Sequence, residues 1–346
     1  MRKTTFLICI LLLLGLTVSL HAQSPASQYK TANKIHLEGN DGWDYLTVDD
    51  SSGRLYVSHG TMVQVVDTRT GKIVGVISNT IGVHGIALAS DLNKGFISNG
   101  KDSSVTIFDL QTLAFIAKLP VTGRNPDAIL YDKFSHHVFA FNGTTSNATV
   151  IDAKTNKVAA TIALDGKPEF PTTDGVGTVY VNIEDKNLID VINAKTLTID
   201  KKWPIAPGEE PTGMAIDNEN HLLFVVCGNK IMVIADAKTG TIVTTVPIGD
   251  HADAAAFDTA RKRAYSSNGD GTLTVIQEQS RDKFAVIENV VTQKGARTMA
   301  LDNKTHRLFL PTAEFGPAPA PTLENPKPRP PIVPNSFVIL EVEPAK

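Results

Sequence analysis

The sequence predicts an all-β fold built from one repeated unit of four short strands, and three observations support this. Short apolar runs such as Met62–Val66 are rich in Val, Ile, Tyr and Phe, which favour strands. Turn residues such as those of Asp67–Gly71 separate the runs, and Gly71 suits the left-handed position of a hairpin. The pattern returns every 40–45 residues or so, which is typical of the blades of a β-propeller.

The second strand of each unit carries an aromatic residue at an equivalent position. Neighbouring aromatic positions are 40 to 44 residues apart, and they are Tyr56, Phe96, Phe139, Tyr180, Phe224, Tyr265 and Phe309. Helical repeats of similar length would need apolar residues at 3.6-residue spacing, whereas these runs are short, β-branched and interrupted by glycine. Seven units therefore predict a seven-bladed β-propeller with four strands in each blade.

The two ends of the chain are predicted to close the ring. Tyr29–Leu37 has the composition of a strand but belongs to no unit of its own. The last unit has three predicted strands, Arg297–Leu301, Arg307–Pro311 and Phe337–Val342, and then the chain stops. We expect the N-terminal strand to supply the missing outer strand of this last blade, which removes two exposed strand edges.

Each unit also carries acidic residues at fixed offsets from the aromatic residue. One set ends a short strand before it (Asp49, Asp132, Asp174, Asp217, Asp258, Asp302), and the other opens a turn after it (Asp67, Asp109, Asp152, Asn193, Asp236). Asp and Asn side chains accept hydrogen bonds from backbone N–H groups two residues further on, which closes turns. We interpret both sets as structural.

The N-terminus resembles a secretory signal peptide. Arg2 and Lys3 precede the apolar run Phe6–Leu14, and residues 1–22 end on Ala22. The alternative is an uncleaved membrane anchor, but the run is shorter than the roughly 20 residues that a membrane span needs. We expect a mature chain of residues 23–346 that forms a single propeller domain, is exported to the periplasm or the extracellular space, and does not insert into a membrane.

Composition narrows the classes of partner. Loss of Arg2 and Lys3 changes the formal net charge from −3 to −5, and no basic patch stands out, so no nucleic-acid partner is expected. Only Cys227 remains as a cysteine in the mature chain, so no intrachain disulfide can form. We expect a monomer, with a small molecule, a peptide or another protein as its partner.

One insertion departs from the repeat. Residues 314–335 hold eight prolines and lie between the second and third predicted strands of the last unit. Proline predicts an extended, stiff loop without regular strand pairing. In a propeller this connection lies on the face where the inner strands begin. The loop is predicted either to have a function or to cover the joint of the ring passively.

The repeated rows resemble a known family. LYVSHG, GFISNG and VYVNIE, each followed by a VxVxDxxTGK-like segment, resemble the YVTN-repeat β-propellers, the YncE-like proteins, which are related in architecture to WD40-like repeats. The resemblance covers essentially the whole mature chain and implies the fold. It implies little about activity, because the shared pattern consists of structural residues. Units four and seven lack the glycine that follows the second strand.

The candidate ligand site is the mouth of the central channel, where the inner strand of each blade begins. Alignment on the aromatic residue places one side chain per blade there: Asp44, His84, Asp127, Glu169, Thr212, Asp253 and Arg297. Trp43 and His251 lie beside them on the loops that lead into the strands. Four carboxylates brought together repel one another unless a cation compensates them.

Three interpretations of this ring remain open. A divalent metal ion is the one cofactor the residues suggest, with Asp44, His59, His84 and Asp127 as ligands, because imidazole and carboxylate groups bind Zn²⁺ and other transition ions. Alternatively, Arg297 forms ion pairs with Asp253 and Asp44, or the ring is simply a water-filled polar channel mouth.

The function we expect is that of an exported binding or interaction module, which takes a small ligand, a cation or a peptide at the acidic channel mouth. The alternative is a metal-assisted hydrolase of the lactonase type that uses the same site, with a nearby carboxylate as base. A third class, a periplasmic partner of a redox or transport system, has no feature that separates it from the first. The chain contains no G-x-S-x-G, P-loop, CxxC or CxxCH motif.

Overall fold

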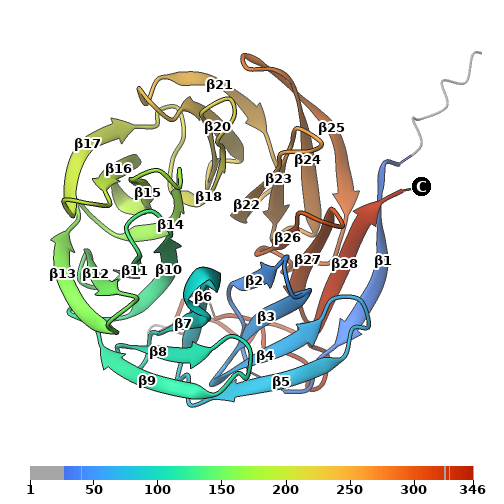
Figure 1. Ribbon diagram of the computed structural model, residues 1–346. Helices are drawn as coiled ribbons and strands as arrows, with labels where there is room; N and C mark the ends of the chain where they lie inside the picture. Colours follow the sequence, from blue (N-terminus) through green and yellow to red (C-terminus); the bar gives the residue numbers. More distant parts are fainter. Residues whose placement is uncertain (1–26, 40, 323–324, 327, 346) are drawn as a thin grey trace, which may run out of the picture.

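The computed structural model describes residues 27–39, 41–322, 325–326 and 328–345, which form a ring of seven four-stranded antiparallel sheets (Figure 1). The first strand of each sheet lies near the centre of the ring and the last at its rim. The predicted seven-bladed β-propeller is therefore confirmed. The predicted signal peptide, residues 1–22, lies outside the described residues.

Blades one to four follow one another along the chain. Blade one contains β2 (Leu46–Asp49), β3 (Arg54–His59), β4 (Met62–Asp67) and β5 (Ile73–Ser78). Blade two contains β6 (Val83–Ala89), the 3₁₀ turn η1 (Ser90–Leu92), β7 (Lys94–Asn99), β8 (Ser104–Asp109) and β9 (Phe115–Pro120). Blade three contains β10 (Pro126–Asp132), β11 (His137–Asn142), β12 (Asn147–Asp152) and β13 (Lys157–Ala163). Blade four contains β14 (Pro168–Thr173), β15 (Thr178–Ile183), η2 (Glu184–Lys186), β16 (Leu188–Asn193) and β17 (Thr198–Pro204).

Blades five to seven complete the ring. Blade five contains β18 (Pro211–Asp217), β19 (Leu222–Cys227), β20 (Ile231–Asp236) and β21 (Ile242–Pro247). Blade six contains β22 (Ala252–Asp258), β23 (Arg263–Asn268), β24 (Thr272–Ser280) and β25 (Lys283–Val291). Blade seven contains β26 (Ala300–Asp302), β27 (Arg307–Thr312), β28 (Val338–Pro344) and β1 (Tyr29–His36). The inner strand predicted at residues 297–301 is shorter than expected, and Arg297 precedes it.

The core lies between the blades. The middle strands are buried on both faces, since each blade packs against two neighbours. Among the described residues there is one cluster of buried apolar side chains for each of the seven interfaces between adjacent blades. Between blades three and four, for example, Phe139 and Phe141 pack with Val179 and Val181. Each such side chain contributes about 1.5–3 kcal/mol by leaving water.

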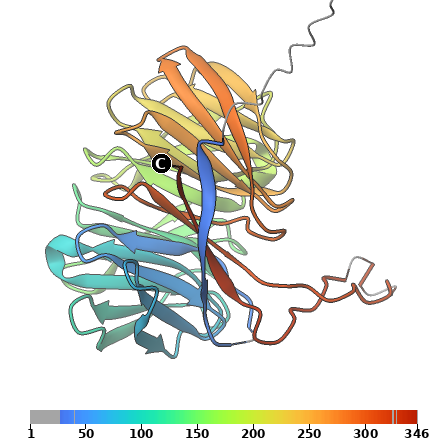
Figure 2. The same cartoon turned by 90° about the vertical axis from the view of Figure 1, so that its right-hand side faces the viewer.

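The ring is closed by β1, as predicted. It pairs antiparallel with β28 from Tyr29 opposite Pro344 to His36 opposite Val338. Tyr29 also reaches blade six, where its hydroxyl lies 2.8 Å from the hydroxyl of Tyr265 and accepts a hydrogen bond from Arg263 at 2.9 Å. Figure 2 shows β1 running along the edge of the ring beside the C-terminal strand.

The acidic residues of the repeat hold turns and join blades. Asp67 Oδ1 accepts hydrogen bonds from the backbone N–H groups of residues 69 and 70, and Asp109, Asp152, Asn193 and Asp236 do the same in their turns. In the other set, Asp132 accepts a bond from Thr173 of the next blade at 2.8 Å, and Asp258 pairs with His306 of the next blade at 2.7 Å. Their structural role is confirmed.

The Pro-rich insertion projects from one face of the ring (Figure 2). We call it the arm (residues 314–335, of which 323–324 and 327 are outside the described residues). It was expected to lack regular pairing, but its base forms one antiparallel bridge between Phe315 and Ile332. The N–H groups of Gly316 and Val333 donate to the carbonyl oxygens of Pro331 at 2.8 Å and of Glu314 at 2.9 Å. The two sides of the arm are thus paired with each other at its base.

Candidate functional site

The start of each inner strand supplies one side chain to the channel mouth. His84, Asp127, Glu169, Thr212 and Asp253 are the second residues of β6, β10, β14, β18 and β22. Asp44 and Arg297 lie just before β2 and β26. All seven side chains predicted from the sequence line one cavity of about 470 Å³, together with His251. The inner strands converge on the axis of the ring, which brings residues more than 200 positions apart into this one cavity.

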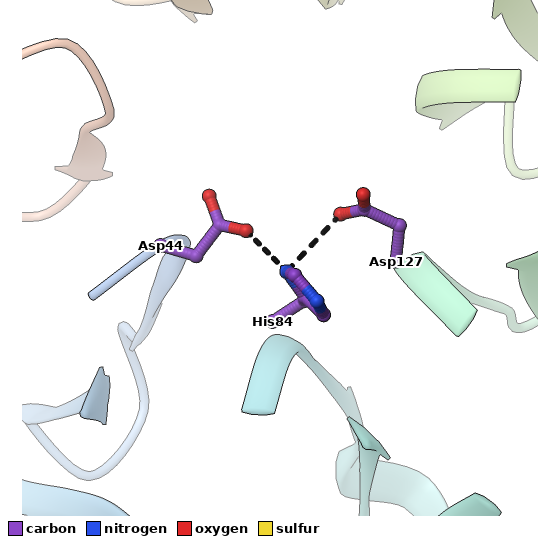
Figure 3. Close-up of side chains that lie close together, drawn as sticks. All are labelled: Asp44, His84 and Asp127. Carbon is purple, nitrogen blue, oxygen red and sulfur yellow. Dashed lines mark hydrogen bonds and ion pairs between the residues drawn. The ribbon is translucent and has the colours of Figure 1, made fainter. Parts of the chain in front are cut away.

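Three of these side chains form a tight cluster (Figure 3). His84 Nδ1 lies 2.5 Å from Asp44 Oδ2 and 3.6 Å from Asp127 Oδ1. One potential ligand atom from each residue lies within 4.8 Å of the other two. Nδ1 carries at most one proton, so it can donate to only one of the two carboxylates. Two carboxylates and one imidazole this close together are a ligand set that can bind a divalent transition-metal ion.

Hydroxyl and amide side chains of neighbouring blades hold parts of the ring in place. Ser98 Oγ accepts a hydrogen bond from the N–H of Gly85 at 2.8 Å and donates to the carbonyl oxygen of Asp127 at 2.5 Å. Ser267 Oγ donates to the carbonyl oxygen of Arg297 at 2.5 Å. Asn182 and Thr298 bind the carbonyl oxygens of Thr212 and Asp44 in the same way. Four of the seven ring residues, Asp44, Asp127, Thr212 and Arg297, are thus bonded at their backbone by a side chain of a neighbouring blade.

Gly100 leaves room for the histidine of the cluster. A Cβ atom at this position would lie 2.5 Å from Nε2 of His84 and 2.6 Å from Oδ1 of Asn125. Both distances are shorter than any real Cβ contact, so a larger residue would displace the imidazole. The glycine after the second strand recurs in the repeat, and in blade two it leaves room for the imidazole of His84.

Burial makes three carboxyl groups of the ring hard to ionise. It raises the pKa of Asp127 to about 6 against the lowering influence of His84. It also raises the pKa of Asp253 to about 6, although Arg297 opposes this. Burial and then the charge of Asp127 raise the pKa of Glu169 to about 8, despite Lys167 Nζ at 2.8 Å. Placing carboxylates together in a cavity costs free energy, and any added cation relieves that cost.

The pKa of the histidine of the cluster is raised as well, although burial acts in the opposite direction there. Burial lowers the pKa of His84, but its hydrogen bond with Asp44 and the charges of Asp127, Asp44 and Glu169 outweigh burial and raise the pKa above its usual value. A protonated His84 is thus favoured while the neighbouring carboxylates are ionised.

Three basic side chains compensate part of the acidic ring. Arg297 Nη1 lies 2.8 Å from Asp253 Oδ2, as predicted for this pair, whereas no direct contact of Arg297 with Asp44 is found among the described residues. Lys167 contacts both Glu169 and Glu184. Arg329, from the arm, lines the cavity as well.

His59, which was predicted as a fourth metal ligand, does not join the Asp44–His84–Asp127 cluster. Both of its ring nitrogens have other partners, because Nδ1 lies 3.0 Å from Oε1 of Gln64 and Nε2 lies 3.1 Å from the carbonyl oxygen of Asp41. The ring packs on Phe337 with a centroid distance of 4.3 Å and is 1 % exposed. His59 is a structural residue at the end of β3.

Trp43 lies beside the acidic cavity and not in it. It lines a neighbouring cavity of about 480 Å³, together with Phe315 and Ile332 of the arm. His251, Arg297 and Arg329 line both cavities.

Several lining residues of the acidic cavity were not predicted: Tyr45, Lys167, Glu184, Glu210 and Arg329. Tyr45 is 7 % exposed and packs on Phe170 with a ring-centroid distance of 5.2 Å. Lys167 stands two residues before Glu169, and this spacing is the one signal that could have identified it. Arg329 belongs to the arm, whose path has no counterpart in the repeat.

Other candidate reactive residues lie elsewhere. Cys227 is buried in the core between blades four and five, where burial raises the pKa of its thiol to about 12, so it is not a nucleophile at neutral pH. His136, His221 and His306 have positive φ angles and occupy the turns between first and second strands, on the opposite face from the arm.

Comparison with known proteins extends these observations only at the level of the fold. No family model matches the chain. Antigen Lp49 from Leptospira interrogans is 27% identical over 195 residues, which is 51% of this chain and 40% of that protein. The chain thus spans less than half the length of this curated relative.

Three solved structures have the same fold. A chain of Kuenenia stuttgartiensis hydrazine synthase has a TM-score of 0.69 at 17% identity and covers 80% of this chain and 94% of that one. A chain of the mitotic checkpoint complex has a TM-score of 0.72 at 14% identity, and the match covers 90% of this chain and 95% of that one. The structure of U3-55K has a TM-score of 0.73 at 8% identity, and the match covers 92% of this chain and 99% of that one.

Within the described residues, no helix is long and apolar enough to span a membrane. At these identities, the likeness to the three solved structures establishes a β-propeller and nothing about its ligand.

Proposed function

We propose that this chain is an exported propeller of the YVTN-repeat (YncE-like) type that binds a small cationic ligand at the acidic channel mouth. The family assignment rests on the recurring rows around the aromatic positions and on the seven-bladed fold. Export rests on the signal-peptide pattern of residues 1–22. Propellers commonly present their channel mouth to a ligand or a partner, so the ring is where binding is expected.

The observation that carries the proposal is the imbalance of charge in the acidic cavity. Six carboxylates line it (Asp44, Asp127, Glu169, Glu184, Glu210 and Asp253), against three basic side chains and two histidines. The two carboxylates nearest His84 share a single Nδ1 atom. Burial, and for Glu169 also the charge of Asp127, raises the pKa values of Asp127 and Glu169 to about 6 and about 8, which supports a site where a further cation would be favourable. A cationic ligand would supply the missing charge.

The test uses simple cations on the purified mature chain. We expect 1,4-diaminobutane, Zn²⁺ or Mn²⁺, each added alone, to bind in calorimetry and to raise the melting temperature. The Asp44→Ala/His84→Ala double variant should lose the binding that depends on the cluster. Asp282→Asn, a matched change on an exposed acid of the β24–β25 turn, should bind like the wild type. Failure of all three cations to bind would contradict the proposal.

The Asp44–His84–Asp127 cluster also supports a second candidate, a metal-dependent hydrolase of the lactonase type. With a divalent ion on this cluster, the ion would polarise a carbonyl group or activate water. Glu169 is the nearby carboxyl group that could exchange a proton, since its pKa is raised to about 8 by burial and the charge of Asp127. The residues around the cluster leave a cavity of about 470 Å³ for a substrate.

Metal analysis separates the two candidates. A hydrolase of this kind should contain a stoichiometric divalent ion, lose lactone hydrolysis on chelation and regain it when the ion is returned. A metal-free protein whose melting temperature is unaffected by chelators and by added divalent ions would exclude the hydrolase and leave organic cations as ligands.

A further inference from the structure

The acidic cavity continues into a second cavity with a different chemical character. This second cavity, the arm cavity, measures about 480 Å³ and lies between the channel mouth and the base of the arm. Trp43, Phe315, Pro330 and Ile332 give it an apolar wall. His251, Arg297 and Arg329 form the boundary, because they line both cavities.

The apolar wall is built in advance of any ligand. Trp43 packs on Phe337 with a centroid distance of 5.0 Å and faces Phe315 at 6.1 Å. The Phe315–Ile332 bridge fixes the arm side of the wall. Gly295 allows this approach, since a Cβ atom there would lie 2.7 Å from Cε2 of Phe315. Phe315 nevertheless remains 40 % exposed, so its ring offers apolar surface to the cavity.

The boundary between the two cavities is positively charged. The charge of Asp253, and to a lesser degree that of Asp44, raises the pKa of Arg297, so this guanidinium stays charged beside the acidic ring. Its Nη1 atom forms an ion pair with Oδ2 of Asp253 at 2.8 Å. Arg329 makes no hydrogen bond or ion pair with any residue in the described part of the chain, which leaves its donors for a ligand. Guanidinium groups bind carboxylates through paired donors.

The cavities therefore present three zones in order: carboxylates, guanidinium groups and an apolar wall. We propose that the ligand is an α-amino acid with an apolar side chain, bound with its ammonium group at the acidic cluster, its carboxylate between Arg297 and Arg329, and its side chain against Trp43 and Phe315. This inference rests on the proposed function, because it places the cationic group of the ligand in the same acidic cavity. It adds a carboxylate and an apolar side chain to the groups that the ligand must carry.

Four probes that differ by one group each test the order of the zones. L-Phenylalanine carries all three groups, phenethylamine lacks the carboxylate, 3-phenylpropionate lacks the amine, and glycine lacks the apolar group. We expect L-phenylalanine to bind most tightly by calorimetry. Each of the other three should bind at least about tenfold more weakly, the scale of one charge-assisted hydrogen bond or one buried ring.

Variants assign the groups to residues. Arg329→Gln should weaken L-phenylalanine about tenfold and leave phenethylamine unchanged, whereas Asp44→Asn should weaken both. Trp43→Ala should reduce the preference for L-phenylalanine over glycine. Arg124→Gln is the matched control, since Arg124 is an exposed arginine in the loop before β10 that lines neither cavity. Circular dichroism melts establish that each variant is folded.

The outcomes separate this inference from the function on which it rests. If phenethylamine binds as tightly as L-phenylalanine, or if Arg329→Gln weakens both equally, the carboxylate zone is wrong while cation binding stands. If 1,4-diaminobutane binds and none of the four probes does, the amino acid is wrong and the acidic site stands. If neither diamine, metal ion nor amino acid binds, both proposals fail together.

Discussion

At the scale of single residues, the acidic ring depends on side chains that do not line the acidic cavity. Ser98 is fully buried and uses its one hydroxyl both to accept from Gly85 and to donate to the backbone of Asp127. These bonds tie blade two to blade three at the point where His84 and Asp127 meet. A buried hydroxyl with two partners stabilises the fold and also sets the position of the cluster.

Replacing Ser98 by alanine should therefore affect both stability and binding. The change leaves the N–H of Gly85 and the carbonyl oxygen of Asp127 without this partner in a buried site, which costs roughly 1–3 kcal/mol in the free energy of unfolding. We also expect weaker binding of 1,4-diaminobutane, because Asp127 loses its anchor. Chemical denaturation and calorimetry measure the two effects. Ser280→Ala, at the exposed end of β24, is the control, and equal stabilities of the two variants would contradict this role.

The two histidines near the mouth show how far the role of a single residue could be predicted from the sequence. Alignment on the aromatic residue placed both His59 and His84 at strand ends on the same face. His84 lies at the start of an inner strand and faces the axis, but His59 ends a second strand and is held by Gln64 and the backbone of Asp41. Strand position was readable from the repeat. The hydrogen-bond partner of each ring depends on loop residues that the repeat does not encode.

At the scale of elements, one strand carries the closure of the ring. β1 pairs with β28 along its length, and Tyr29 is 1 % exposed within the core between blades six and seven. Without β1, blade seven would have three strands and β28 would present unpaired backbone groups at the rim. The closure joins residues more than 300 positions apart, so it forms only when the whole ring is assembled.

Removal of residues 27–37 should destabilise the whole propeller and not just one blade. The truncated chain loses the pairing with β28 and the buried ring of Tyr29, and an aromatic residue deleted from a core costs about 3–5 kcal/mol by itself. We expect a large fall in the melting temperature and aggregation through the exposed edge. A smaller change, Tyr29→Phe, should cost about 1 kcal/mol through the lost hydrogen bonds with Tyr265 and Arg263. A truncated chain that melts like the full one would contradict closure by β1.

The repeat explains why the elements were predictable while the arm was not. Blade number, strand order and closure follow from a regular period and from a strand left over at the N-terminus. Residues 314–335 have no copy elsewhere in the chain, so their path could not be inferred by alignment. The arm contributes Arg329 to the acidic cavity and forms one wall of the second cavity. The arm residues that line the two cavities were thus the part of the candidate site that could not be placed from the repeat.

At the scale of the whole molecule, the acidic ring makes stability depend on pH. The pKa values of Asp127 and Asp253 are raised to about 6 and that of Glu169 to about 8, mainly by burial, from ordinary values near 4. Between about pH 5 and 8, these three groups therefore bind more protons in the folded protein than in the unfolded chain. The raised pKa of His84 has the same sign, because its stabilisation is lost as the pH rises through its folded pKa.

We therefore expect the ligand-free protein to become less stable as the pH rises from 5 to 8. Each unit of pKa shift corresponds to about 1.4 kcal/mol, so the fall in the free energy of unfolding should be on the order of a few kcal/mol. Glu169→Gln keeps the shape of the side chain but cannot ionise, so its melting temperature should fall less over the same range. Asp190, outside the ring, also has a pKa raised to about 6 by burial, and Asp190→Asn measures its separate share. Thermal melts at pH 5, 6.5 and 8 give the slopes, with Asp282→Asn expected to behave like the wild type. A wild-type stability that rises over this range, or a Glu169→Gln slope equal to that of the wild type, would show that the ring does not bear uncompensated charge, and the case for a cationic ligand would lose its basis.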